Sequence, residues 1–156
     1  MGIAEKIQEF GWSTVVYFEA ADLEGLAPFL NRLPGIIVVD HIGRPDVAKG
    51  VDHPDFRRFV DLMANNERIW SKVTCPERLT VAGPPYDDVI PFGQTIVDAF
   101  PDRVLWGTDW PHPNLKDHMP DDGLLVDFIP HIATTAQLQR KLLVENPMRL
   151  YWPEEV

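Results

Sequence analysis

The sequence predicts an α/β fold in which parallel strands alternate with helices, and three observations lead to this prediction. Four short runs of β-branched and aromatic residues recur at regular spacing, each is followed by a stretch with helical periodicity, and each ends in a cluster of polar residues. The segments between the runs are long enough for the right-handed crossovers that parallel strands require. The four runs occupy residues 13–18, 36–39, 69–74 and 103–106.

The first half of the chain is expected to contain two of these strands. Residues 3–10 have the pattern of an amphipathic helix, which Gly11 stops because glycine adopts the left-handed backbone of a helix end at little cost. Residues 23–33 are helical in pattern, with Pro28 near the first turns. The continuous apolar run at 36–39 is typical of a strand that is buried on both faces.

The second half repeats this pattern. Three helices are expected there, at residues 54–66, 86–100 and about 135–145. Pro54 stands at a first helical position, which proline favours. Pro91 falls within the second helix, and Thr134 or Thr135 caps the last one.

Length and composition describe one domain over residues 1–156 and exclude several classes of partner. The hydrophobic fraction of 45% is that of a globular protein. The net charge of −10 repels phosphate backbones and anionic lipid surfaces, so we expect no nucleic acid and no membrane as partners. No apolar run approaches the ~18 residues that span a bilayer, and the amino terminus has no signal pattern. A single cysteine, Cys75, fits a cytoplasmic protein.

Polar residues follow each of the four strands at the point where the strand ends. These clusters comprise residues 17–19, 40–46, 75–79 and 107–112. The carboxyl ends of parallel strands meet at one edge of a sheet, where ligands bind in such folds. The loop from Cys75 to Tyr86 is too long and too rich in proline for a plain connection, and we expect it to form a wall of the site.

Asp109 and His41 are the strongest candidates for chemistry. Gly107, Pro111 and the residues between them hold Asp109 in a constrained turn, where it can activate water, bind a metal or merely cap a helix. His41 follows an apolar strand and can hydrogen-bond a substrate carbonyl, bind a metal or cap the strand end. The residues that surround each of them favour a functional role.

Four further side chains are candidates for substrate binding. Arg78 can clamp a carboxylate with its planar guanidinium, or pair with Glu77 or Asp87 at the surface. The other three candidates are Arg44, His112 and Tyr17.

Each of these three also has a structural interpretation. Arg44 can instead pair with Asp46, His112 can orient Asp109 from behind, and Tyr17 can be a core residue. We expect the remaining histidines, His53, His118 and His131, to cap helices or lie on the surface, and Cys75 to be a small buried residue.

Motifs of other enzyme classes do not occur in the sequence. It contains no His-x-His, no His-Glu-x-x-His, no glycine-rich phosphate loop and no Gly-x-Ser-x-Gly. His41 and Asp109 supply two metal ligands, whereas a catalytic zinc site usually takes three from the protein. We therefore expect no metal and no other cofactor.

Three segments together resemble the amidohydrolase superfamily. They are the strand that leads into His41-Ile42-Gly43-Arg44-Pro45-Asp46, the loop at 75–86, and residues 105–113. Within this superfamily the chain is most similar to the lactonases that act on 2-pyrone-4,6-dicarboxylate in bacterial degradation of aromatic compounds. The resemblance implies a distorted (β/α)8 barrel and hydrolysis without a divalent metal. It assigns the activation of water to Asp109, the polarisation of the lactone carbonyl to His41, and the binding of substrate carboxylates to Arg78 and Tyr17.

The same resemblance implies that the chain forms roughly the carboxyl-terminal half of a barrel. Members of the family are nearly twice as long and begin with a strand that carries His-x-His, which this sequence lacks. An open half barrel exposes two strand edges and one side of its core. We therefore expect a fragment, a truncated gene product, or a protein that pairs with itself or with a missing amino-terminal half.

These observations predict a hydrolase that opens the ring of a small anionic carboxylated lactone. One alternative is a metal-dependent hydrolase or decarboxylase of the same superfamily, with His41 and Asp109 as ligands. Another is a half barrel without catalytic activity that dimerises or binds a ligand.

Overall fold

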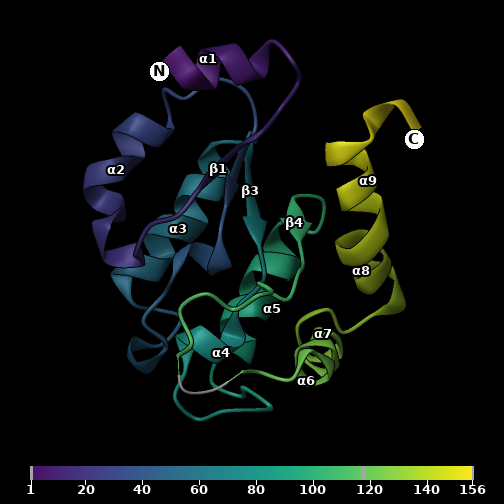
Figure 1. The fold of residues 1–156 in the computed structure, drawn as a ribbon. Coiled ribbons are helices and arrows are strands. Elements are labelled where there is room, and N and C mark those ends of the chain that lie inside the picture. Colours follow the sequence, from purple (N-terminus) through teal and green to yellow (C-terminus); the bar gives the residue numbers. More distant parts are fainter. Residues whose placement is uncertain (1, 117–118, 156) are drawn as a thin grey trace.

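Four parallel strands form one sheet in the order β1-β2-β3-β4 (Figure 1). The computed structural model describes residues 2–116 and 119–155. The strands are β1 (Thr14–Val16), β2 (Ile37–Val39), β3 (Ile69–Lys72) and β4 (Val104–Leu105). Val38 pairs with Val15 on one side and with Trp70 on the other, and Lys72 pairs with Leu105. All four expected strands are thus present, each shorter than its apolar run.

Helices connect the strands and follow the last one. The longer helices and single turns are α1 (Gly2–Gln8), η1 (Ala20–Asp22), α2 (Leu23–Leu30), η2 (His41–Gly43), η3 (Val47–Lys49), α3 (Pro54–Asn65), α4 (Pro76–Leu79), α5 (Ile90–Ala99), α6 (Asp122–Asp127), α7 (Ile129–Ile132), α8 (Ala136–Arg140), η4 (Lys141–Glu145), α9 (Asn146–Tyr151) and η5 (Pro153–Glu155). No helix in the described ranges has the length and apolar character that crossing a membrane requires.

Local sequence signals account for where several helices begin. Pro54 occupies the first turn of α3, and His53 caps this helix by accepting a hydrogen bond from the Asp55 N–H. Thr135 caps α8 in the same way. Pro91 lies in the first turn of α5, because this helix begins at Ile90 rather than at residue 86.

Two parts of the carboxyl-terminal region differ from the sequence prediction. The expected last helix does not end near Glu145; it continues through the π-helical turn η4 into α9. Between β4 and α8 the chain also forms α6 and α7, which periodicity had not indicated. Both helices are too short to display a clear helical period.

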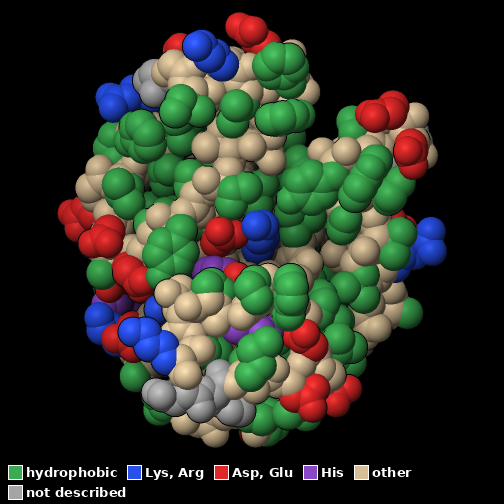
Figure 2. Space-filling view, in the orientation of Figure 1, with side chains coloured by type: hydrophobic (Ala, Val, Ile, Leu, Met, Phe, Trp, Pro, Cys, Tyr) green, Lys and Arg blue, Asp and Glu red, His purple; other side chains and the backbone are tan. Residues whose placement is uncertain are grey.

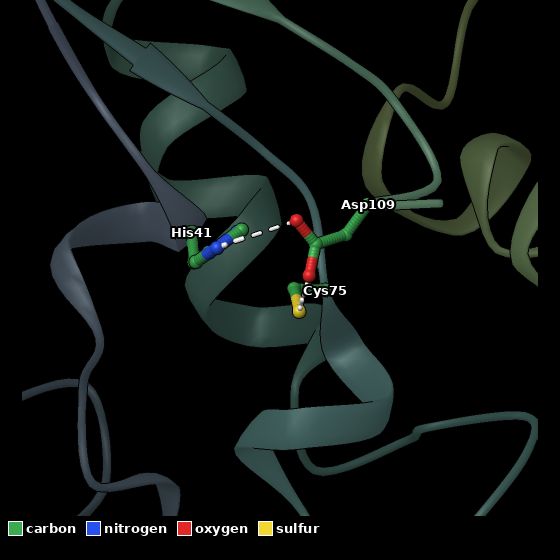
Figure 3. Close-up of side chains that lie close together, drawn as sticks. All are labelled: His41, Cys75 and Asp109. Atoms are coloured by element: carbon green, nitrogen blue, oxygen red, sulfur yellow. Dashed lines mark hydrogen bonds and ion pairs between the residues drawn. The ribbon is translucent and has the colours of Figure 1, made fainter. Parts of the chain in front are cut away.

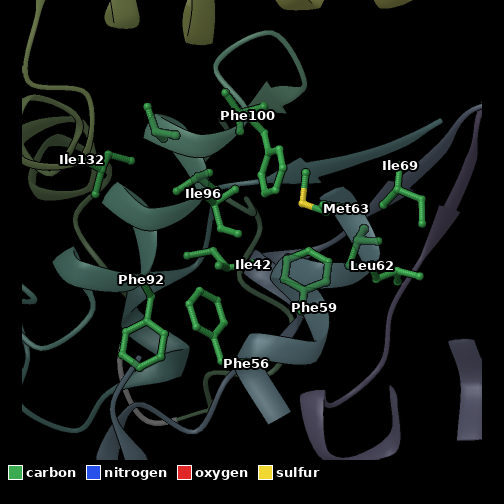
Figure 4. Packing of buried hydrophobic residues seen from close by; sticks show 14 of the residues in the cluster. Ile42, Phe56, Phe59, Leu62, Met63, Ile69, Phe92, Ile96, Phe100 and Ile132 are labelled. Atoms are coloured by element: carbon green, nitrogen blue, oxygen red, sulfur yellow. The ribbon is translucent and has the colours of Figure 1, made fainter. Parts of the chain in front are cut away.

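The main hydrophobic core lies between one face of the sheet and helices α2, α3 and α5 (Figure 4). Side chains at alternate strand positions, such as Ile37 and Val39, point into it. Phe56 of α3 meets Phe92 of α5 edge to face, with ring centroids 4.8 Å apart. This packing fixes α3 and α5 against the strands, and thereby fixes the loops at the strand ends.

The opposite face of the sheet carries a smaller apolar cluster. Val38, Trp70 and Leu105 form it, and Leu150 of α9 packs against them. The Arg149 guanidinium lies 5.1 Å from the centroid of the Trp70 ring. The carboxyl-terminal helices thus cover part of this face, although they stand beside the sheet in Figure 1.

The outward edges of the two outer strands, β4 and β1, are covered to different extents. The buried Asn146 side chain donates to the β4 carbonyl of Val104 at 2.8 Å and to that of Pro101 at 2.9 Å. At the other end of the sheet, the Val15 side chain of β1 is 49% exposed. Asn146 therefore satisfies a carbonyl that an adjacent strand would otherwise bind.

Replacement of Gly93 by alanine is expected to destabilise the fold. A Cβ atom at Gly93 would lie 2.5 Å from the Cγ2 atom of Ile132, so α5 and α7 would have to move apart. We expect the free energy of unfolding to fall by about 1–3 kcal/mol in urea denaturation. Gly25→Ala is the matched control, because Gly25 is an exposed residue of α2 with nothing within 4 Å of its Cβ position. It should stabilise the protein by about 0.5–1 kcal/mol. Equal effects of the two substitutions would contradict this account of the packing.

Candidate active site

Three potential donor residues converge beyond the carboxyl ends of β2, β3 and β4 (Figure 3). They are His41, Cys75 and Asp109, and each has a left-handed backbone, with φ of 53°, 69° and 64°. Residues other than glycine rarely adopt this conformation, so it marks positions where the chain turns sharply. These turns bring the three side chains together.

His41 is buried and is held by two neighbours. Its Nδ1 atom lies 2.7 Å from the Thr74 hydroxyl oxygen, and the Tyr17 ring meets the imidazole edge-on at a centroid distance of 5.9 Å. Burial lowers the pKa of His41 below its usual value, although the nearby Asp109 carboxylate acts in the opposite direction. The imidazole is therefore neutral at neutral pH, and the Nε2 atom faces Asp109.

The two carboxylate oxygens of Asp109 have different surroundings. Oδ1 lies 3.7 Å from His41 Nε2, which is longer than a direct hydrogen bond. Oδ2 accepts a hydrogen bond from Arg78 Nη1 at 3.2 Å and another from the Cys75 thiol at 3.3 Å. The side chain is 21% exposed, so a small molecule can reach it.

Cys75 takes part in the site, although the sequence indicated only a small buried residue. Burial raises the pKa of its thiol, and the carboxylates of Glu77 and Asp109 raise it further. The side chain therefore remains a protonated thiol that donates to Asp109, and its thiolate is disfavoured. The position directly after the predicted strand at 69–74 was the sequence signal that could have identified it.

Arg78 and Arg44 lie side by side at the rim. Arg78 pairs with Asp109 instead of Glu77 or Asp87. Arg44 Nη1 donates to the main-chain oxygen of Arg78 at 3.0 Å.

The second contact of Arg44 involves a residue that the sequence analysis did not single out. Arg44 Nε lies 3.4 Å from Glu19 Oε1, so Arg44 pairs with Glu19 and not with Asp46. Tyr17, which is 50% exposed and no core residue, donates to the same Glu19 oxygen at 2.8 Å.

His112 lies behind the site between two acidic residues. Its ring nitrogens are 3.3 Å from Glu77 Oε1 and 3.1 Å from Asp122 Oδ1. The ring therefore does not orient the Asp109 carboxylate, but the His112 main-chain N–H donates to the Asp109 carbonyl at 2.8 Å. His112 thus holds the turn that carries Asp109 through its backbone. The substrate-binding role expected for His112 stays a prediction.

Of the other histidines, the structure describes His53 and His131. His53 caps α3 and His131 is exposed, as expected. His118 lies outside the described residues.

A cavity of about 360 Å³ opens beside these groups. Glu19, Arg44, Lys49 and Arg78 contribute to its lining. Figure 2 shows acidic, basic and histidine side chains gathered near the centre of one face of the molecule, with hydrophobic side chains around them. Arg78 contacts both Asp109 and the cavity, and so connects the reactive groups to a volume that can hold a small ligand.

The donor atoms of His41, Cys75 and Asp109 lie within 4.8 Å of one another, which is compatible in distance with a metal ion. One observation opposes a divalent cation at this position. The Arg78 guanidinium already occupies Asp109 Oδ2, so a cation there would meet a fixed positive charge. With Arg78 in this position, the three residues fit a metal poorly.

Comparisons of the chain with a family model and with individual proteins agree on one family. The amidohydrolase family model matches residues 1–152. The chain is 63% identical to a 2-pyrone-4,6-dicarboxylate hydrolase of Comamonas testosteroni, with 100% of this chain and 54% of the relative covered. It is 41% identical to a 4-sulfomuconolactone hydrolase of Hydrogenophaga intermedia, with 92% of this chain and 48% of the relative covered.

A solved structure gives the same result for the fold. A probable 2-pyrone-4,6-dicarboxylic acid hydrolase of Acinetobacter baumannii, with citric acid bound, superimposes with a TM-score of 0.78 at 26% identity. The match covers 94% of this chain and 55% of that protein. The chain thus spans about half the length of these relatives and matches the carboxyl-terminal half of their barrels, as the sequence predicted. It belongs to the amidohydrolase family.

Proposed function

We propose that this chain carries the water-activating half of a lactone hydrolase site. The observation that carries this proposal is the arrangement of Asp109, with one oxygen fixed by Arg78 and the other facing a neutral His41 across 3.7 Å. The substrate is a small anionic carboxylated lactone such as 2-pyrone-4,6-dicarboxylate. Two relatives named as lactone hydrolases, at 63% and 41% identity, support this class of reaction.

In the first step, Asp109 Oδ1 takes a proton from a water molecule, and the resulting hydroxide attacks the lactone carbonyl carbon. The gap between Oδ1 and His41 Nε2 is too long for a direct hydrogen bond, and an oxygen atom placed between them can contact both. Arg78 and Cys75 hold Oδ2, so the carboxylate cannot rotate away from the water.

His41 stabilises the negative charge that develops on the carbonyl oxygen. When the Thr74 hydroxyl donates to Nδ1, the ring proton is on Nε2 and can be donated to this oxygen. Collapse of the intermediate then breaks the ring C–O bond. The leaving oxygen takes the proton that Asp109 had received. The other product group is a carboxylic acid, which releases the second proton of the water to solvent and becomes a carboxylate.

Arg78, Arg44 and Tyr17 bind the carboxylates of the substrate in this proposal. A guanidinium offers five N–H donors, and the contact between Arg78 and Asp109 uses only part of them. Since the protein has a net charge of −10, a dianion binds only where fixed arginines outweigh the background. The citric acid bound by the Acinetobacter baumannii protein is likewise a carboxylate ligand.

No cofactor takes part in this reaction. The proposed cellular location and association partner of the protein come from the sequence. The free Cys75 supports a cytoplasmic protein. The exposed side chain of Val15 on the outer strand β1 supports association with a second copy or with an amino-terminal half barrel.

A chimeric protein separates the hydrolase from a half barrel without activity. The amino-terminal half of the Comamonas testosteroni relative, joined to this chain, should hydrolyse 2-pyrone-4,6-dicarboxylate, measured as loss of the pyrone absorbance. The chain by itself and the same chimera with Asp109→Asn are the controls. A folded chimera with no more activity than these controls would support the remnant and refute the lactonase.

Steady-state kinetics of this chimera should distinguish the roles of Asp109 and Arg78. Asp109→Asn should reduce kcat by at least about 10²-fold and leave KM nearly unchanged, because an amide keeps the shape but cannot accept the proton. Arg78→Met should chiefly raise KM, because it removes a charge-assisted contact that exists in both ground and transition states. An active Asp109→Asn variant together with an unchanged KM in Arg78→Met would overturn both roles.

The stability of the chain should decrease as the pH falls below the ordinary histidine range, in part because of His41. Burial lowers the pKa of His41, so the unfolded chain takes up a proton on acidification before the folded one does. The stability is fully present above the unfolded pKa of about 6.5 and is lost as the pH falls from there towards the folded pKa.

The contribution of His41 is limited to about 1.4 kcal/mol per pH unit, the value for one proton. His41→Asn should reduce the slope in urea unfolding between pH 7 and pH 5, while His131→Asn, at an exposed position, serves as the control. Identical slopes in all three proteins would show that His41 is not the titrating group.

A metal is not expected to bind stoichiometrically. After incubation with zinc or manganese and gel filtration, elemental analysis of the chain and of the chimera should find far less than one ion per protein, because Arg78 holds Asp109 Oδ2. Arg78→Met is the informative comparison, since it frees this oxygen. One zinc or manganese ion per wild-type protein, lost in His41→Asn, would favour the metal-dependent alternative instead.

A further inference from the structure

Each cation that lines the cavity already faces a carboxylate of the protein. Arg78 pairs with Asp109, and Arg44 pairs with Glu19. The third cation, Lys49, lies 3.6 Å from an oxygen of Asp46 and 3.7 Å from one of Asp55. Within the described ranges, these three cations face four carboxylates, so the empty cavity has no excess positive charge. A dianionic ligand therefore has to replace at least one protein carboxylate.

Of the two carboxylates that pair with the arginines of the cavity, Glu19 is the one that a ligand can replace more easily. Its side chain is 49% exposed, whereas that of Asp109 is 21% exposed and is held by both Arg78 and Cys75. Glu19 follows β1 in an extended conformation, and its contact with Arg44 is long, at 3.4 Å. Exposed ion pairs of this kind contribute little to stability, so rotation of the Glu19 side chain into solvent costs little.

The donors around Glu19 resemble those of a carboxylate-binding site. One oxygen, Oε1, accepts from the Tyr17 phenol at 2.8 Å and lies 3.4 Å from Arg44 Nε. Burial and the hydrogen bond to Glu19 raise the pKa of Tyr17, so the phenol keeps its proton. Arg44 and Arg78 are further linked by the hydrogen bond from Arg44 Nη1 to the Arg78 carbonyl. A ligand carboxylate in place of Glu19 would find the Tyr17 phenol and the Arg44 guanidinium.

We propose that Glu19 takes the place of a substrate carboxylate in the free protein. It holds Tyr17 and Arg44 in their binding positions, and the carboxylate of the ligand displaces it when the cavity is filled. This inference depends on the proposed function and makes it more specific, because it assigns one substrate carboxylate to the Tyr17–Arg44 position. Ligands with a second carboxylate can displace Glu19 and bind to its partners. Ligands with only one carboxylate gain less binding free energy from these partners, which makes Glu19 a determinant of specificity for dianions.

Nuclear magnetic resonance titration of the chain with isophthalate tests the displacement. Isophthalate is a planar aromatic dicarboxylate that cannot be hydrolysed, and benzoate is its monocarboxylate counterpart. In the wild-type chain, isophthalate should shift the Arg44 Nε–H resonance more than benzoate does. Glu19→Gln removes the competing charge but keeps the side-chain shape and an acceptor oxygen. It should lower the Kd of isophthalate by about two- to fivefold, the range expected for an exposed ion pair, and change that of benzoate less.

Asp46→Asn is the matched control. Asp46 lines the same cavity and its loss removes the same charge, but it pairs with Lys49 instead of Arg44. The Kd of isophthalate should change by less than twofold in this variant. Equal tightening in both variants would indicate a general charge effect and overturn the proposal.

Other outcomes would also be decisive. Weaker isophthalate binding in Glu19→Gln would show that Glu19 only positions Tyr17 and Arg44. No shift of Arg44 by isophthalate in the wild-type chain would refute the assigned position as well. The titration measures no hydrolysis, so an inactive chimera with the expected Glu19 effect would refute the lactonase and leave this inference intact.

Discussion

The candidate site depends on left-handed backbone turns where the chain leaves the strands. His41, Cys75 and Asp109 all adopt positive φ, and Ile42 and Arg44 continue this conformation after His41. Such residues cost about 1–3 kcal/mol each and persist only where the surrounding structure enforces them. Ile42 is buried in the core, and a Cβ atom on the neighbouring Gly43 would lie 3.0 Å from the Phe59 ring. Packing of α3 beneath the loop thus fixes the position of His41.

Asp109 is the electrostatic centre to which the three loops contribute. The loop after β2 supplies a neutral imidazole, and the loop after β3 supplies the Cys75 thiol and the Arg78 guanidinium. The loop after β3 also carries Glu77, which contacts His112. Because His112 belongs to the loop that bears Asp109, this contact joins the two loops. Pairing of the cavity cations Arg44, Lys49 and Arg78 with carboxylates limits the cost of burying charge, but it also means that a charged ligand must compete with the protein's own groups. The specificity of the site then depends on which protein carboxylate is easiest to displace.

The sheet also explains how half of a barrel can keep an ordered site. Residues of helices α2, α3 and α5 contribute to a hydrophobic core on one face, and the side chains His41, Cys75 and Asp109 all come from the loops after β2, β3 and β4. The other face has a small cluster that Leu150 partly covers, and a groove beside it is lined by exposed aromatic residues such as Phe10 and Trp12. The chain matches the carboxyl-terminal half of barrels that are about twice its length. Association with another polypeptide is therefore a separate requirement from the geometry of Asp109 and its neighbours.

The sequence by itself determined the α/β class, the presence of four parallel strands and the convergence of His41, Arg78 and Asp109 at one edge. These features follow from local periodicity and from the rule that loops at the carboxyl ends of parallel strands meet. Only the tertiary structure decided that Arg78 pairs with Asp109, that Cys75 donates to the same carboxylate, and that Arg44 pairs with Glu19. The partners in these contacts are 31, 34 and 25 positions apart in the chain. Local sequence patterns cannot select among several carboxylates at such separations, because the choice depends on how the core packing orients each loop.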